Sequence, residues 1–498
     1  MRELKLKFKI QNLRKRYPKF LYKHYSYRVS DNSLEIFFYF QIEPDIYFNP
    51  KIIIENVDKG LIKRVGDKVL DNLIFHLGLM EIPSYWKAAC SPEIEIKAGY
   101  LNEEQIKWWK DLIMKGMGQF FYENQIDFRK PNFLKIKVSS IRVNQAIAEF
   151  TRMHSKKVLV PVGGGKDSVV TLELLKRTNK DIRCFSLNPT DAALKIMKIA
   201  GCKKPIIIRR KIDEKLLELN RRGFLNGHTP FSAYLAFLSV FIATIYGLKY
   251  IAFSNERSSN EGNVKYLGRV INHQWSKSFE FEQKFRKYSQ KYLTPGVKYF
   301  SFLRPLYEIQ IVKLFSRYPK YFSVFLSCNV AYQTASGTKK PIKKWCGNCS
   351  KCLFIFATLY PFLNEKRLLQ IFSQNLLENK QLLPVMQELI GERKFKPFEC
   401  VGTKKESLVA FYLSWKKAKS GQELFLTKLP FLLRYFEEKI LPRTEPQVLV
   451  RGLPKYPNLE KESKKLLNSW NSQNNLSKEF EKVLFVKKSR KKVNFVLS

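Results

Sequence analysis

The feature that most constrains the fold of this chain is a glycine-rich turn near residue 160. An apolar run, Val158–Val162, precedes the turn, and residues with apolar side chains at helical spacing follow it. This order is typical of a buried parallel strand, a turn and a helix. The turn consists of Gly163, Gly164, Gly165, Lys166, Asp167 and Ser168. Glycines let backbone amides approach an anion, and the dipole of the following helix favours negative charge. Lys166 and Ser168 add side-chain donors, so the segment predicts a site for a nucleoside triphosphate.

The turn is not a Walker A loop. Lys166 is followed by Asp167 instead of Ser or Thr, and the four-residue spacer after the first glycine is missing. The turn resembles instead the Ser-Gly-Gly-x-Asp-Ser loop of the PP-loop ATP pyrophosphatases. This resemblance implies cleavage of ATP between its α and β phosphates and adenylation of an oxygen. The leading serine of that loop is Gly163 here, which removes one hydroxyl donor, and a glycine-rich turn that binds nothing is the alternative interpretation.

Strand and helix patterns alternate between about residues 151 and 365. The pattern predicts an α/β fold with a doubly wound parallel sheet of the PP-loop type. Ligands of such sheets bind at the carboxyl ends of the strands, so Gly163–Ser168, Leu187–Thr190 and Ser254–Asn260 are expected on one rim. The expected strands are Val158–Val162, Ile182–Leu187, Pro205–Ile208 and Tyr250–Ser254.

Two further regions flank this domain, as the length of 498 residues suggests. Residues 1–150 predict an α+β region, and residues 366–498 predict a mostly helical region with a basic tail, Lys487–Lys492. In the first region the expected strands are Leu34–Ile42 and Lys51–Glu55, and the expected helices are Asp67–Leu79 and Asn102–Asn124.

Composition narrows the class of partner and the cellular location. The net charge is +45, but the lysines are scattered along the chain, which favours anionic substrates over a polynucleotide surface and leaves the latter open. The uncharged segment Thr229–Leu248 contains polar residues and ends beside Gly247, so it predicts a buried crossover helix and no membrane span. With 8 cysteines and no apolar signal-like segment at the start, the chain fits a reducing cytoplasm.

A cluster of cysteines predicts a metal site. Cys346, Cys349 and Cys352 are separated by two-residue gaps, which lets a tight turn aim their thiols at one ion. Cys328 is the nearest fourth ligand, and Cys400 competes with it. Four thiolates suit a structural zinc ion, with an iron–sulfur cluster or an unliganded turn as alternatives.

Polar groups after the last expected strand predict substrate contacts. Asn255, Glu256 and Arg257 combine an acceptor carboxylate with a fork-shaped donor for phosphate or carboxylate. His273 lies among polar residues beside Lys277, so an acid/base role and a purely structural role are both open.

Several of these segments together resemble the UDP-N-acetylmuramoyl-L-alanyl-L-glutamate epimerase family of bacterial peptidoglycan synthesis. The resemblance covers roughly residues 20 to 415 and leaves out the last eighty or so. The segments that carry it are residues 85–92, 118–122, 161–168, 254–260, 272–278, 327–329, 345–352 and 396–402.

The resemblance implies that ATP, water and UDP-MurNAc-L-Ala-L-Glu are converted to AMP, pyrophosphate and UDP-MurNAc-L-Ala-D-Glu. For this reaction we assign ATP and Mg²⁺ to Gly163, Gly164, Gly165, Lys166, Asp167 and Ser168, with Lys166, Asp167 and His273 catalytic. We assign substrate contacts to Asn255, Glu256, Arg257, Lys277 and Arg304, and zinc to Cys328, Cys346, Cys349 and Cys352. Cys328 is the second choice for the acid/base. The alternatives are a PP-loop tRNA-thiolation or 7-cyano-7-deazaguanine synthase-like enzyme, and a non-enzymatic scaffold.

Overall fold

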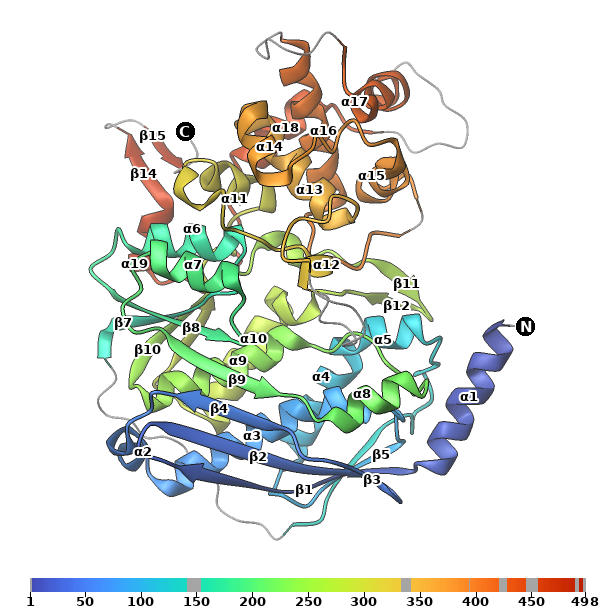
Figure 1. Cartoon of the computed structure of the whole chain (residues 1–498), viewed down its shortest axis with the longest axis vertical. Helices are drawn as coiled ribbons and strands as arrows, with labels where there is room; N and C mark the ends of the chain where they lie inside the picture. Colours follow the sequence, from blue (N-terminus) through green and yellow to red (C-terminus); the bar gives the residue numbers. More distant parts are fainter. Residues whose placement is uncertain are drawn as a thin grey trace.

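An 11-stranded sheet organises the molecule (Figure 1). The computed structural model describes residues 2–140, 154–332, 342–393, 395–420, 428–444, 456–488 and 492–495. The strand order is β13-β10-β7-β8-β9-β4-β2-β1-β5-β6, and β3 pairs with β2. The strands are β1 (Lys19–Val29), β2 (Ser33–Ile42), β3 (Ile46–Phe48), β4 (Lys51–Glu55), β5 (Glu93–Ile96), β6 (Lys135–Val138), β7 (His154–Pro161), β8 (Asp181–Leu187), β9 (Ile206–Lys211), β10 (Leu248–Phe253) and β13 (Lys298–Ser301).

The half of the sheet from β13 to β9 is parallel. Strand β7 pairs in parallel with both β8 and β10, and β10 in turn pairs with β13. The chain therefore proceeds from β7 to one side through β8 and β9, and then to the other side through β10 and β13. Ligands of open α/β sheets bind at the carboxyl ends of the strands at such a reversal, and we call this end of β7 and β10 the crevice. The four strands predicted in this region are confirmed, with bounds that differ by a few residues.

Helices cover both faces of this parallel half. Along β7, Val158 and Val160 are buried in one hydrophobic core with α6 (Lys166–Leu175), whereas Leu159 is buried in a second core with α9 (Phe231–Ile245). Alternate side chains of a strand point to opposite faces, so both faces are buried. The predicted α/β class with a large, mostly parallel sheet is confirmed. The buried helix expected in Thr229–Leu248 is α9, and among the described helices none is long and apolar enough to cross a membrane.

The first 140 residues extend the same sheet. Strand β4 pairs antiparallel with β9, with Lys51 opposite Lys211 and Ile54 opposite Ile208. Strand β2 alternates buried and partly exposed residues along its length, so one of its faces packs against the helices of this region. The sequence does not predict this continuity, and the expected boundary at 150/151 lies outside the described residues.

The helices of the N-terminal half differ in detail from the expected ones. The predicted helix Asp67–Leu79 continues to Trp86, and the predicted helix Asn102–Asn124 is split at Met117. The helices up to β13 are α1 (Arg2–Arg16), α2 (Lys59–Val65), α3 (Asp67–Trp86), α4 (Glu103–Gly116), α5 (Gly118–Glu123), α6 (Lys166–Leu175), α7 (Asp191–Ile199), α8 (Glu214–Arg221), α9 (Phe231–Ile245) and α10 (Phe279–Tyr292).

The C-terminal part is mostly helical, as predicted, and stacks on the side of the sheet that carries α6 (Figure 1). A hairpin of β14 (Phe485–Lys488) and β15 (Lys492–Phe495) was not predicted, and residues 489–491 of the basic tail lie outside the described residues. The helices are α11 (Glu308–Phe315), α12 (Asn329–Tyr332), α13 (Ser350–Leu359), α14 (Glu365–Phe372), α15 (Leu383–Ile390), α16 (Lys404–Lys419), α17 (Phe431–Tyr435), α18 (Leu459–Leu467) and α19 (Lys478–Glu481).

Two cysteines of the parallel half form a disulfide. Cys184 of β8 is bonded to Cys202, which follows α7. The sequence analysis does not predict this pair. The remaining cysteines are free, so the protein lacks the dense disulfide framework of a small secreted domain.

Candidate functional site

The glycine turn connects β7 to α6 at the crevice, as the sequence predicts. Gly164 has a φ of +95°, a conformation that glycine adopts readily, and its carbonyl accepts a hydrogen bond of 2.9 Å from the amide of Leu326. A Cβ on Gly163 would meet nothing within 4 Å. Gly165 is the N-cap of α6, and no side chain caps this helix. The amides of the first turn are therefore directed at the crevice without a side-chain acceptor, which is the arrangement that binds an anion.

Two carboxylates hold the lysine of the turn. Lys166 is only 1% exposed, and its ammonium donates hydrogen bonds to Asp167 and to Glu308, the first residue of α11. Burial lowers the pKa of Lys166, but the two carboxylates raise it more, so the side chain stays charged. Ser168 donates its hydroxyl to the carbonyl of Gly165 at 2.8 Å and thus closes the turn.

The segment after β10 borders the same crevice. Glu256 is 2% exposed, and its Oε1 has no hydrogen-bond partner among the described residues. Burial, and then the negative charge of Glu308, raise the pKa of Glu256 to about 7. Asn255 donates to the Ser301 hydroxyl at 3.2 Å, and the guanidinium of Arg257 lies 4.3 Å from the centre of the Tyr307 ring. The predicted segment thus presents a buried carboxyl group that retains a proton near neutral pH.

Lys277 and His273 meet at Cys400. The ammonium of Lys277 donates to Cys400 Sγ at 3.2 Å, and His273 Nε2 lies 3.9 Å from the same sulfur. Burial lowers the pKa of His273 to about 3, with a further contribution from Lys277 and other nearby lysines, so the imidazole is neutral. The structure therefore brings two predicted residues together around a thiol that the sequence analysis considers only as a metal ligand.

Arg304 has an internal role in this structure. Its guanidinium is fully buried, forms an ion pair of 3.2 Å with Glu282, and donates to the carbonyls of Glu256 (2.6 Å) and Lys277. These bonds fix the two segments that border the crevice. Arg304, predicted to contact substrate, is occupied by protein groups and positions Glu256 and Lys277.

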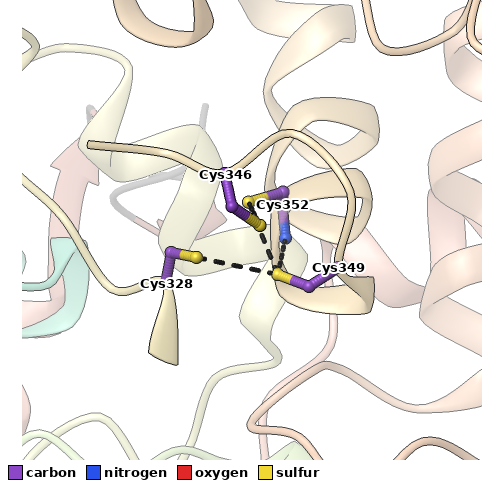
Figure 2. A group of neighbouring side chains, drawn as sticks. All are labelled: Cys328, Cys346, Cys349 and Cys352. Atoms are coloured by element: carbon purple, nitrogen blue, oxygen red, sulfur yellow. Dashed lines mark hydrogen bonds between the residues drawn. The ribbon is translucent and has the colours of Figure 1, made fainter. Parts of the chain in front are cut away.

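The four predicted cysteine ligands converge on one point (Figure 2). The sulfur atoms of Cys328, Cys346, Cys349 and Cys352 lie within 4.8 Å of one another. This spacing fits four thiolates around one tetrahedral ion. The fourth member is Cys328, whereas Cys400 lies against Lys277 outside the group.

The cysteine cluster also positions a lysine in the crevice. Lys351 stands between Cys349 and Cys352 at the start of α13 and is 4% exposed. Its ammonium donates to the carbonyl of Cys400 and lies 3.8 Å from Glu308 Oε1. The cluster therefore anchors a turn whose lysine faces the same carboxylate that holds the lysine of the glycine turn.

Sequence reasoning missed Glu308, Lys351 and the place of Cys400. An acidic residue in the first turn of a helix is common because it complements the helix dipole, so Glu308 carried no distinct signal. Lys351 and Cys400 lie within segments 345–352 and 396–402 that carry the family resemblance, which was the available signal.

The fold and the site define an α/β protein with a glycine turn at the switch point of a parallel sheet and a group of four cysteines. Comparison with known proteins makes the assignment specific. The MurL N-terminal domain matches residues 11–302, and the MurL C-terminal domain matches residues 324–433. The chain belongs to the MurL family, which confirms the resemblance seen in the sequence.

Curated relatives carry one name, UDP-N-acetyl-alpha-D-muramoyl-L-alanyl-L-glutamate epimerase. The relative from Xanthomonas oryzae pv. oryzae is 31% identical over 75% of this chain and 81% of its own length. The relative from Micromonospora sp. is 35% identical over 66% of this chain and 72% of its own length. The relative from Salinispora tropica is 35% identical over 66% of this chain and 70% of its own length.

Proposed function

We propose that this protein is an ATP-dependent epimerase that converts UDP-MurNAc-L-Ala-L-Glu to UDP-MurNAc-L-Ala-D-Glu. The names of its curated relatives support the substrate. The observation that carries the ATP dependence is the uncapped N-terminus of α6, which follows the glycine turn and begins with a buried lysine held by Asp167 and Glu308.

The chemistry explains why an epimerase would use ATP. Removing the α proton beside a free carboxylate adds a second negative charge to that group, which is very costly. Attack of the glutamate α-carboxylate on the α phosphorus of ATP forms an acyl-adenylate and releases pyrophosphate. The acyl group of this mixed anhydride no longer carries the charge and accepts the electron pair of the C–H bond, so a side chain of ordinary basicity can remove the proton. Hydrolysis then releases AMP.

The glycine turn suits the phosphates of ATP. The open space at Gly163 leaves room for phosphate oxygens, and the amides of the first turn of α6 donate to them. Lys166 adds positive charge, and Asp167 can share a Mg²⁺ ion with the phosphates, because Mg²⁺ is commonly held by one or two carboxylates together with substrate phosphates. Asn255, Glu256, Arg257 and Lys277 border the space left for the second reactant.

We also propose a structural zinc ion on Cys328, Cys346, Cys349 and Cys352. Four thiols within 4.8 Å fit a closed site, and their position beneath Lys351 gives the ion a role in shaping the crevice.

The release of AMP tests this function against its main alternative. The protein is incubated with ATP and Mg²⁺, and with either the UDP-linked L-Ala-L-Glu substrate or bulk tRNA. We expect AMP and pyrophosphate to form with the dipeptide substrate and D-glutamate to be recovered from it. Release of AMP with tRNA alone would instead favour an RNA-modifying PP-loop enzyme.

A further inference from the structure

The Cys400 thiol lies at the crevice without a role in the function proposed above. Its Sγ accepts a hydrogen bond of 3.2 Å from the Lys277 ammonium and lies 3.9 Å from His273 Nε2. Burial lowers the pKa of Lys277, but Cys400 and Glu256 raise it more, so the donor stays charged. An ammonium hydrogen bond stabilises negative charge on sulfur, and the thiolate is the reactive form of cysteine.

Protein groups fix the backbone around this thiol on both sides. The carbonyl of Cys400 accepts a hydrogen bond from the Lys351 ammonium. The carbonyl of Val401 accepts from Gln274 Nε2 at 3.5 Å, and that of Pro397 from Asn263 Nδ2 at 2.7 Å. Cys400 itself is partly exposed. The residue is therefore held in place while it remains partly exposed.

The hydrogen bonds of His273 define which of its nitrogens carries the proton. Gln119 donates its amide nitrogen to Glu123 Oε1 at 2.7 Å, so the amide oxygen of Gln119 faces His273 Nδ1. Nδ1 must then donate to that oxygen. In a neutral imidazole the other nitrogen, Nε2, is an acceptor, and it is the atom that faces Cys400 Sγ. His273 Nε2 can thus accept a hydrogen bond from the thiol and hold the sulfur in place.

A chain of contacts connects the thiol to the glycine turn. Lys351 touches the Cys400 carbonyl and lies 3.8 Å from Glu308, which in turn binds the Lys166 ammonium. Glu256, whose charge acts on Lys277, points an unpartnered Oε1 into the same buried region of the described structure. A free carboxyl oxygen at this place is an independent sign of a ligand that binds between the thiol and the turn.

We propose that Cys400 is the catalytic residue that takes the α proton of the glutamyl group, an inference that rests on the function proposed above. Its sulfur lone pair accepts the α hydrogen as a proton, and the C–H electron pair moves onto the acyl oxygen of the adenylate to form an enolate. A proton delivered to the opposite face of Cα, from water or a second acid, gives the D configuration. No net oxidation or reduction occurs. Lys277 and His273 are positioning residues: the Lys277 ammonium donates to the sulfur, and His273 Nε2 faces it.

Two partial reactions of the enzyme distinguish a failure of the role proposed for Cys400 from a failure of the proposed function. Adenylation is followed as exchange of labelled pyrophosphate into ATP in the presence of the L,L-substrate, and proton removal as incorporation of solvent deuterium at the glutamate α carbon. Wild-type enzyme that shows no substrate-dependent pyrophosphate exchange would overturn the proposed function itself. The variants are Cys400→Ala and the near-isosteric Cys400→Ser. The second keeps the test valid if the first does not fold.

For both variants we expect deuterium incorporation and D-glutamate formation to fall by at least about 100-fold, the size of a general acid–base contribution. Pyrophosphate exchange is expected to stay within roughly threefold of wild type, because the variants leave the glycine turn intact. Deuterium incorporation above about a tenth of the wild-type rate in a folded variant would overturn the proposal. An equal loss of both reactions would also overturn it, since Cys400 would then act in binding.

Alkylation tests the positioning role of Lys277. Because the thiolate is the form that reacts with iodoacetamide, Lys277→Gln is expected to slow alkylation of Cys400 at pH 7 by about tenfold, as read by peptide mass mapping. A change that only loosened the fold would speed the reaction. An unchanged or faster rate would contradict the role of the ammonium.

Discussion

The two glycines at the start of the turn should respond differently to the same added methyl group. A Cβ on Gly164 would lie 3.0 Å from the Ala192 Cβ and the Thr190 hydroxyl, at a φ of +95°. A Cβ on Gly163 would meet nothing within 4 Å, and its φ is not in the left-handed region. We therefore expect Gly164→Ala to be costly and Gly163→Ala to be tolerated.

The magnitude follows from the backbone conformation and the contacts. A side chain in a left-handed conformation costs about 1–2 kcal/mol, and the tight contacts bring the sum for Gly164→Ala to about 2–3 kcal/mol. The protein can bear this strain, which lowers the free energy of unfolding, or it can relieve the strain by moving the turn, which weakens ATP binding. Since 1.4 kcal/mol is a factor of ten, full relief corresponds to a loss of roughly 30- to 150-fold in ATP affinity.

Calorimetric titration with ATP and Mg²⁺, together with denaturant unfolding, measures both parts in each variant. For Gly164→Ala the two losses should add up to about 2–3 kcal/mol. For Gly163→Ala the free energy of unfolding should stay within about 0.5 kcal/mol of the wild type, because the added Cβ meets no protein atom within 4 Å. Equal losses in the two variants, or no loss in Gly164→Ala, would refute the described geometry of the turn.

Three further changes test other parts of the site. Cys349→Ser should abolish bound zinc in elemental analysis and lower kcat at least about tenfold, because the turn that carries Lys351 loses its anchor; a folded, zinc-free variant of full activity would contradict this link. Arg304→Met leaves Glu282 buried without its ion-pair partner and should lower the free energy of unfolding by about 3–5 kcal/mol, whereas an unchanged melting temperature would exclude the internal role. Burial first, and then Glu308, raise the pKa of Glu256 from 4.5 to about 7, so between these values the folded protein holds a proton that the unfolded chain releases. Stability should therefore fall as the pH rises from about 4.5 to about 7, and Glu256→Gln should flatten part of this slope in melting curves; an identical slope in the variant would show that Glu256 does not titrate there.

The parts of the fold that follow from local patterns could be predicted from the sequence. The apolar run Val158–Val162 followed by glycines leaves few alternatives to a strand that ends at a turn, and the structure has β7 and α6 there. The spacing of Cys346, Cys349 and Cys352 similarly restricts them to one turn. Such features depend on neighbours within about ten residues, which a sequence displays directly.

The parts that depend on distant pairing could not be predicted. The β-branched run in Lys51–Glu55 indicates a strand, but nothing in it identifies β9 as the partner. The sequence also does not indicate where a basic side chain points. Arg304 binds Glu282 inside the protein, whereas Lys351 reaches the crevice. Both are basic residues, and only the three-dimensional packing distinguishes a structural cation from one that lies beside the glycine turn.

The path of one oxygen atom tests the central claim most directly. UDP-MurNAc-L-Ala-L-Glu labelled with ¹⁸O in the glutamate α-carboxylate is incubated with the enzyme, ATP and Mg²⁺, and the AMP is analysed by mass spectrometry. Attack of this carboxylate on the α phosphorus, followed by attack of water on the acyl carbon, leaves a carboxylate oxygen on AMP. We predict AMP that carries one ¹⁸O for each molecule formed, together with D-glutamate. D-glutamate accompanied by unlabelled AMP, or formed without AMP, would contradict epimerisation through an acyl-adenylate.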